Sequence, residues 1–221
     1  MNVALTAVAV AVGVGAIIAV SSRDPRAALI GLAIVLVGAT FLIDPLPSAA
    51  SVGVRIVGGL LCLSIVRLAA DVGQAEGASS PLGWPAEGLI AIAAAVGGAA
   101  IALQLAVVAN GADLPASHSD VLAAAGSPAI VILAAAAAVL AVGLTPAALG
   151  RPGFGRAVGV ALVTVGVTLL RVGFAGSQSA PNDLEQIAIA GLLVGGAACG
   201  VGLAHASGAR LEATADAEDV T

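Results

Sequence analysis

Long apolar runs, separated by short polar breaks, make up most of this chain. A helix needs about 20 apolar residues to cross the hydrocarbon core of a bilayer, which is roughly 30 Å thick. Helices satisfy their own backbone hydrogen bonds, so they are the natural spanning element in lipid. The pattern therefore predicts an all-α integral membrane protein with seven transmembrane helices. The expected spans are residues 3–20, 27–43, 52–70, 88–109, 128–148, 157–174 and 186–206.

The breaks between these runs are rich in proline, glycine and charged residues, as at Asp24-Pro25 and Asp44-Pro45. We expect a single transmembrane domain over residues 1–206, followed by a polar, acidic cytoplasmic tail at 207–221. The first run has no basic residue before it, and its arginines come after it. That order predicts a membrane span rather than a secretory signal peptide.

The arginines predict the orientation of the spans, because cytoplasmic loops carry an excess of basic residues. If the N-terminus lies outside, six of the eight arginines fall on the inner side: Arg23, Arg26, Arg67, Arg151, Arg156 and Arg210. The predicted topology is therefore N-out and C-in, in the inner (cytoplasmic) membrane. Arg23, Arg26, Arg151 and Arg156 are the expected topology anchors.

Two stretches of the chain are similar to each other. "GLAIVLVGATFLI" from Gly31 and "GVALVTVGVTLLR" from Gly159 share seven of thirteen residues, and the same register aligns Arg23 with Arg151. Three spans can recur in the same orientation only if one further helix reverses the chain between them. The sequence thus predicts a 3+1+3 plan of two parallel repeats about an axis along the membrane normal. Repeat 1 covers about 3–70, the linker helix about 88–109 and repeat 2 about 128–206.

Composition agrees with a bilayer location. The chain has 60% hydrophobic and 10% charged residues, whereas soluble domains carry about 25% charged residues. Lipid is therefore the expected surroundings of the protein. The net charge of −5 arises largely from loops and the tail, and it does not indicate a class of partner.

Arg55 and Arg171 are the two arginines outside this inner set. Each lies near the outer end of a span, and an ionisable residue at membrane depth is a candidate functional residue. The alternative is a structural role, in which each side chain reaches the outer headgroups or pairs with a loop carboxylate. The candidate partners are Asp44 for Arg55, and Asp183 or Glu185 for Arg171.

The other polar residues within the spans are uncharged: Thr40, Ser64, Gln104, Thr164 and Thr168. Each of them can bond to a carbonyl of its own helix or to a neighbouring helix. Gln104 is the most polar. It could line a small cavity, but a hydrogen bond between helices is the favoured role.

The chemistry of an enzyme is missing from the sequence. No Asp, Glu or Lys lies inside any of the seven expected spans, and Glu87 is at the end of one. His118 and His205 are isolated and do not form a metal-ligand pattern, and Cys62 and Cys199 are expected to be buried, unreactive thiols. Without a nucleophile motif, a nucleotide-binding loop or an aromatic platform for base stacking, we expect no catalytic, cofactor or metal residue and no nucleic-acid partner.

The stretch "RDPRAALIGLAIVLVGATFL" resembles the K subunit of bacterial complex I, in which an Arg-Asn pair ends the first span and a Leu-Ile-Gly-Leu run opens the second. Here Arg23-Asp24 and Leu29-Ile30-Gly31-Leu32 fit that pattern. The chain is also similar in length to component E of membrane-bound hydrogenases of the formate-hydrogenlyase type. The acidic loop, last span and polar tail of "NDLEQIAIAGLLVGGAACGVGLAHASGARLEATADAEDV" match that component in layout.

This resemblance implies a membrane subunit that flanks a proton-translocating module, with antiporter-like subunits or a hydrogenase module as partners. The K-like family places a glutamate of the proton path in its second helix, and the aligned positions here are Ala33 and Ala161. The resemblance thus implies a non-catalytic scaffold without its own intramembrane carboxylate. The alternatives are a small, self-contained 3+1+3 transporter or channel for a small solute, like SWEET-type carriers in plan, and a membrane protein with neither role.

Overall fold

The computed structural model describes residues 3–42, 48–73, 83–109, 127–149, 154–175 and 183–218. All regular secondary structure within these ranges is α-helical, which confirms the predicted fold class. The helices are α1 (Val3–Ser21), α2 (Pro25–Phe41), α3 (Ala49–Gly73), α4 (Trp84–Ala109), α6 (Pro128–Ala148), α7 (Phe154–Ala175) and α8 (Asp183–Glu218).

Six of the helices in the described part of the chain are long and apolar enough to cross a membrane. The other, α2, is apolar but has 17 residues, which is at the lower limit for a span. It begins two residues before its expected start because Asp24 caps it: the Asp24 carboxylate accepts a 2.9 Å hydrogen bond from the Arg26 N–H, and Pro25 occupies the first turn. Both residue types favour a helix start.

The last helix is longer than the sequence pattern predicted. We expected it to end near residue 206, but α8 continues through Glu218. The segment after Gly208 contains no proline or glycine and several good helix formers, so the helical conformation does not end where the apolar run ends. Much of the predicted polar tail therefore belongs to helix α8, beyond its apolar segment Glu185–Gly202.

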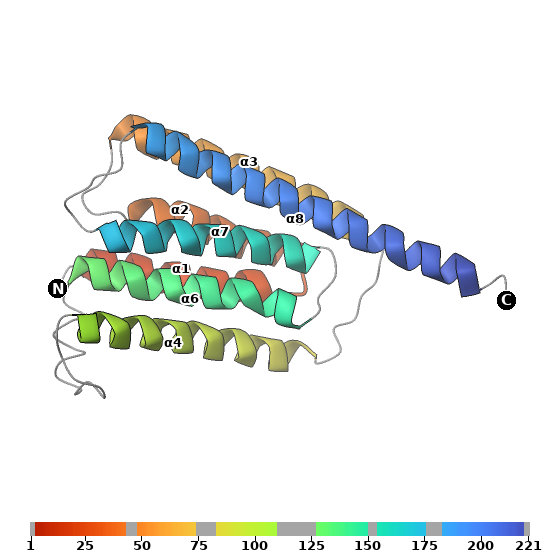
Figure 1. Cartoon of the computed structure of the whole chain (residues 1–221), viewed down its shortest axis with the longest axis horizontal. Helices are drawn as coiled ribbons and strands as arrows, with labels where there is room; N and C mark the ends of the chain where they lie inside the picture. The colour runs from red at the N-terminus through yellow and green to blue at the C-terminus, as the bar shows by residue number, and fades with distance from the viewer. Residues whose placement is uncertain are drawn as a thin grey trace.

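The helices form two rows of three, with α4 along one side (Figure 1). Within each row the helices are neighbours in chain order, α1–α2–α3 and α6–α7–α8. The rows face each other in the same order, because α1 contacts α6, α2 contacts α7 and α3 contacts α8. Helix α4 packs on α6 and α1. Equivalent helices of the two rows thus lie side by side.

Glycines allow the closest helix contacts in both rows. A Cβ atom on Gly31 of α2 would lie 2.6 Å from the Gly15 carbonyl oxygen of α1. In the other row, a Cβ atom on Gly159 of α7 would lie 2.7 Å from the Gly143 carbonyl oxygen of α6. No side chain fits at either crossing without a shift of the backbone, so these helix pairs pack main chain against main chain.

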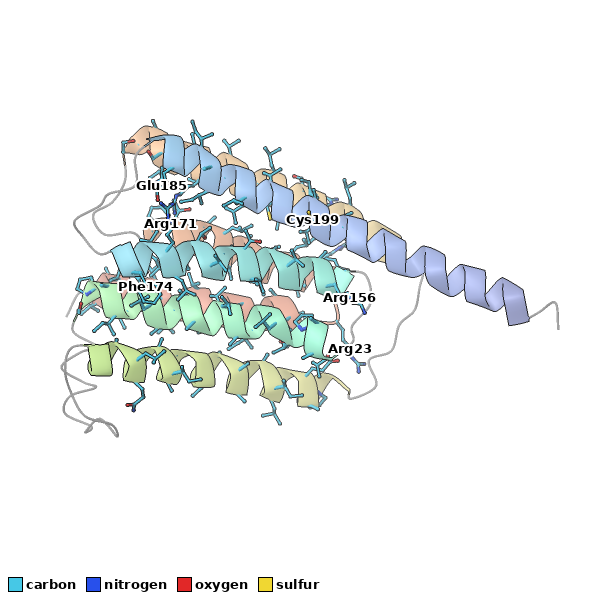
Figure 2. All side chains as sticks on the ribbon, viewed as in Figure 1. Arg23, Arg156, Arg171, Phe174, Glu185 and Cys199 are labelled. Carbon is cyan, nitrogen blue, oxygen red and sulfur yellow. The ribbon has the colours of Figure 1, made fainter. Side chains whose placement is uncertain are left out.

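Charged side chains gather at the two ends of the bundle. Arg23 and Arg156 lie at one end, whereas Arg171 and Glu185 lie at the opposite end (Figure 2). Arg151, the fourth predicted anchor, falls outside the described residues. The separation is the pattern expected of helices that span a membrane, because charges favour the interfaces over the hydrocarbon.

The two cysteines differ from each other in exposure. Cys62 is buried in α3 as expected, but Cys199 is exposed on α8, so the prediction that it is buried was wrong. Its helix presents Ala197 and Gly200 to the interior, which turns Cys199 outward. An apolar residue on a membrane helix can face protein or lipid at similar cost, and the sequence alone does not separate the two.

Candidate functional site

A cluster of polar side chains joins three helices at the Arg171 end of the bundle. Arg55 comes from α3, Glu185 and Gln186 come from the first turn of α8, and Arg171 comes from near the end of α7. Helix α8 contacts both α3 and α7. The packing of these three helices therefore brings the four side chains together, although Arg55 and Gln186 are 131 residues apart in sequence.

Arg55 and Gln186 form the buried part of the cluster. Arg55 is 6% exposed and Gln186 is 0% exposed, and the Arg55 Nε–H donates a hydrogen bond to the Gln186 Oε1 atom. Two further nitrogens, Arg55 Nη2 and Gln186 Nε2, are buried without a hydrogen-bond partner among the described residues. Both are NH2 groups and donate hydrogen bonds, so the cluster can hold an acceptor such as a buried water or a carbonyl oxygen.

Arg171 and Glu185 form the outer part of the cluster. They form a salt bridge, and Glu185 is one of the two candidate partners, with Asp183, that the sequence suggested for Arg171. The Glu185 carboxylate also acts electrostatically on Arg55. The Arg171 side chain is 62% exposed, so this pair lies at the rim. Among the described side chains of the cluster there are two cations and one anion.

The other predicted partners cannot be compared with the structure. Asp44, the predicted partner of Arg55, and the side chain of Asp183 lie outside the described residues. Gln186, which binds Arg55, was not predicted. The available signal was its place beside Glu185 at the start of an apolar run, where an amide is the last polar group before the hydrocarbon.

Replacing Arg171 with leucine is expected to change the stability of the protein little. The salt bridge with Glu185 is at the rim, and exposed ion pairs contribute less than about 1 kcal/mol. Unfolding of the purified Arg171→Leu protein in detergent, compared with the parent chain, measures this. A loss of several kcal/mol would show that Arg171 does more than reach the interface.

Five hydroxyl groups within the spans bond inside their own helices. Thr40 donates to the Leu36 carbonyl oxygen at 3.1 Å, and Thr164 donates to the Val160 carbonyl oxygen at 2.9 Å. Ser64, Thr145 and Thr168 do the same with the carbonyls of Leu60, Val142 and Val165. These contacts satisfy the hydroxyls within each helix and build no polar path from one helix to the next.

The hydrogen bond between helices that we expected of Gln104 stays a prediction for its amide N–H groups. Its Oε1 atom is buried and has no hydrogen-bond partner in the described part of the chain.

Glu87 is more deeply buried than its position suggested. It lies in the first turn of α4, at a span end as predicted, but its side chain is only 1% exposed. A carboxylate in the first turn of a helix is favoured by the helix dipole.

The described residues contain no group of three or more His, Cys, Asp or Glu side chains that could hold a metal ion. His118 and the side chain of His205 lie outside those residues. The arrangement of Arg55 and Gln186 can hold and orient a hydrogen-bond acceptor, but it contains no nucleophile and no chain of proton carriers. Comparison with protein-family models, with curated proteins and with solved structures finds no match to this chain.

Proposed function

We propose that this protein is a non-catalytic membrane subunit of a complex-I-like or hydrogenase assembly. In this role it scaffolds or flanks the proton-translocating module without supplying an intramembrane carboxylate of its own. Its partners are antiporter-like membrane subunits or a hydrogenase module. The proposal rests on the resemblance of the stretch around Leu29–Leu32 to the K subunit of bacterial complex I. This stretch lies in the first half of α2.

The single observation that carries the proposal is the closed contact between the two helix rows. Helices α1 and α6, α2 and α7, and α3 and α8 touch directly, and the hydroxyls of Thr40, Thr164 and Thr168 bond within their own helices. Proton carriers need ionisable groups along a path through the spans. The buried charged side chains of the described residues are Arg55, near the start of α3, and Glu87, in the first turn of α4, so neither lies in the middle of a span. Described residues that offer no such path suit a scaffold better than a pump.

The two positions aligned with the glutamate of the K-like family support a passive role. Ala161 is fully buried in α7, and Ala33 lies on α2 beside α3. A methyl group at either position can carry no proton. In this role another subunit of the assembly supplies the carboxylate.

An internal duplication is part of the proposal, and the glycine crossings support it. Gly143 and Gly159 come 128 residues after Gly15 and Gly31, and the two pairs make the same crossing. Likewise, a Cβ on Gly38 would meet Val12, and a Cβ on Gly166 would meet Leu140, again 128 residues later. Gly15 and Val12 lie outside the two aligned stretches, so they support the same register independently.

The proposed topology remains N-out and C-in within the inner membrane. It is supported by Arg23 and Arg156, which lie at the end of the bundle where the N-terminal helix α1 finishes (Figure 2). Basic residues at that end favour the cytoplasmic side. Cysteine-accessibility labelling of intact cells at the two ends would test the orientation.

A pull-down from native membranes tests the function. We expect a tagged chain, extracted in mild detergent, to bring antiporter-like subunits or a metal-containing hydrogenase module with it, identified by mass spectrometry. An unrelated membrane protein with the same tag is the control for non-specific capture. Recovery of this chain alone, as a monomer or a homo-oligomer, would contradict the proposal.

The alternative is a small, self-contained transporter or channel for a small solute. The parallel 3+1+3 arrangement favours it, since some carriers are built from two such repeats. In those carriers the solute path runs between the repeats, and here that interface is occupied by helix contacts. Solute uptake by liposomes containing only this chain would establish the alternative.

A further inference from the structure

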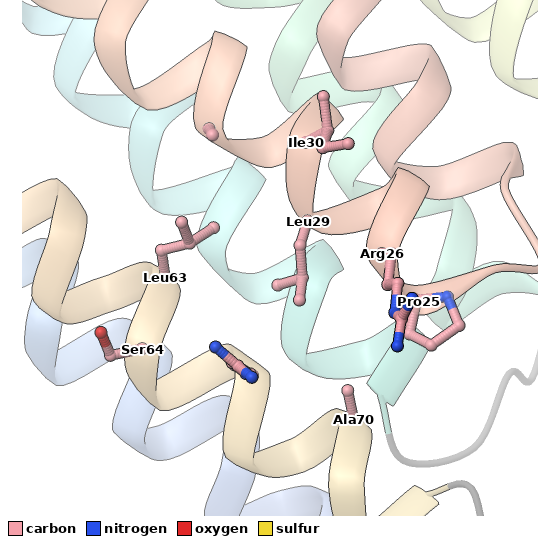
Figure 3. Close-up of a pocket in the computed structure, with 9 residues that line it drawn as sticks. Pro25, Arg26, Leu29, Ile30, Leu63, Ser64 and Ala70 are labelled. Carbon is pink, nitrogen blue, oxygen red and sulfur yellow. The ribbon is translucent and has the colours of Figure 1, made fainter.

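A groove runs between α2 and α3 on the side of the bundle. It has a volume of about 650 Å³, which is within the range of ligand-binding clefts. Among the described residues, its lining comes from these two helices: Pro25, Arg26, Leu29, Ile30, Ala33, Leu63, Ser64, Arg67 and Ala70. In Figure 3 the apolar side chains of Leu29 and Leu63 approach each other from the two helices.

The groove is amphipathic, with its charges at one end. Arg26 is the second residue of α2, and Arg67 is next to Leu68, where the membrane-spanning part of α3 ends. Both arginines are exposed, and both lie at the end of the bundle that also carries Arg23 and Arg156. Farther from that end, the lining consists of Ile30, Ala33 and Leu63 together with Ser64, whose hydroxyl already donates to its own helix.

We propose that this groove binds one anionic phospholipid. Its phosphate lies between Arg26 and Arg67, and one acyl chain follows Ile30, Ala33 and Leu63 toward the bilayer centre. Guanidinium groups bind phosphate oxygens in a bidentate manner. Basic pockets between transmembrane helices at the membrane interface are typical sites for anionic headgroups.

Charge distinguishes a lipid from the other possible occupants. A second copy of this chain, docked symmetrically on the same face, would bring Arg26 and Arg67 toward their own counterparts, which like-charge repulsion opposes. A free phosphate would satisfy the arginines but leave the apolar part of the groove empty. An anionic phospholipid matches both parts at once, and this inference does not depend on the proposed function.

Native mass spectrometry of the full chain in detergent tests the proposal. We expect phosphatidylglycerol to bind, and phosphatidylcholine to bind much more weakly, because its headgroup has no net charge. The double variant Arg26→Gln, Arg67→Gln should bind phosphatidylglycerol about 30-fold more weakly, since each arginine near anionic headgroups contributes about a factor of five. The matched control, Arg23→Gln with Arg156→Gln, removes the same charge from the same end and should bind as the parent chain does.

A second variant tests the acyl-chain part of the groove. Ala33→Phe keeps both arginines and fills the apolar lining, so it should weaken binding of phosphatidylglycerol but not of glycerol phosphate. Equal losses in the groove variant and the control variant would show general charge attraction and overturn the site. Equal binding of phosphatidylcholine, or full competition by glycerol phosphate at the same concentration, would overturn the lipid as the occupant.

Discussion

Replacing Gly31 with alanine is expected to lower the free energy of unfolding by about 1–3 kcal/mol, as for other overpacked sites. The added Cβ would lie 2.6 Å from the Gly15 carbonyl oxygen and 2.6 Å from the Ala19 nitrogen. Both atoms belong to the backbone of α1, so neither can rotate away as the end of a side chain could. Helices α1 and α2 must separate to admit the methyl group, and packing around the crossing is lost with that movement.

The matched control for this variant is Gly13→Ala on α1. A Cβ on Gly13 meets nothing within 4 Å, and alanine is the better helix former by about 1 kcal/mol in a helix interior. The control should therefore be neutral or slightly stabilising. Unfolding of each purified protein by sodium dodecyl sulfate in mixed micelles, followed by circular dichroism, gives the two free energies. Losses of the same size in both variants would mean that the crossing at Gly31 is not tight.

The same substitution in the other row measures how alike the two halves are. A Cβ on Gly159 would lie 2.7 Å from the Gly143 carbonyl oxygen, so Gly159→Ala should cost about as much as Gly31→Ala. The remaining contacts differ, because Gly159 faces the Pro146 side chain whereas Gly31 faces the Ala19 backbone. Tolerance of Gly159→Ala would show that the two crossings share a register but differ in packing.

The sequence predicts where the helices are better than it predicts which face of each helix is buried. Each apolar run became a helix, because length and hydropathy alone decide whether a segment can span lipid. Length and hydropathy do not show which face of each helix is buried. In a water-soluble protein, polar residues mark the face of a helix that lies away from the core, but these helices are apolar on all faces. Cys62 and Cys199 lie in similar runs, yet one is buried and the other is exposed.

The polar cluster was predictable only in part, for a related reason. Arg171 and Glu185 lie on either side of one loop, so their pairing follows from chain order. The contact between Arg55 and Gln186 requires α3 to lie beside α8, and nothing in the hydropathy pattern indicates which distant spans are neighbours. The glycines at 15, 31, 143 and 159 lie at close helix crossings, whereas Gly13 and Gly97 meet nothing within 4 Å, so glycine alone does not indicate where helices pack.

Replacing Arg55 with methionine is the second change from which we expect a large effect. The variant removes the donor to the Gln186 Oε1 atom and leaves that amide buried, with 0% exposure, at the contact of α3 and α8. An orphaned polar group in the interior costs about 1–3 kcal/mol. Measured hydrogen bonds between transmembrane helices contribute about 0.6–2 kcal/mol. We therefore expect a loss of about 1–2 kcal/mol in the same micelle unfolding experiment, well above the effect of Arg171→Leu.

The double variant Arg55→Met, Gln186→Leu separates a structural role from a functional one. Removing both partners leaves no orphaned group, and replacing buried polar pairs with apolar side chains is often neutral or stabilising. Stability should therefore return to the level of the parent chain. Failure of the second change to rescue the first would mean that Arg55 is held by groups other than Gln186. The nitrogens of the cluster are buried, so another subunit does not reach them directly. We therefore expect the stable double variant to co-purify with the same partners as the parent chain, with the cluster acting as a clamp between α3 and α8. Loss of the partners from a stable double variant would show that the cluster also shapes the surface that they bind.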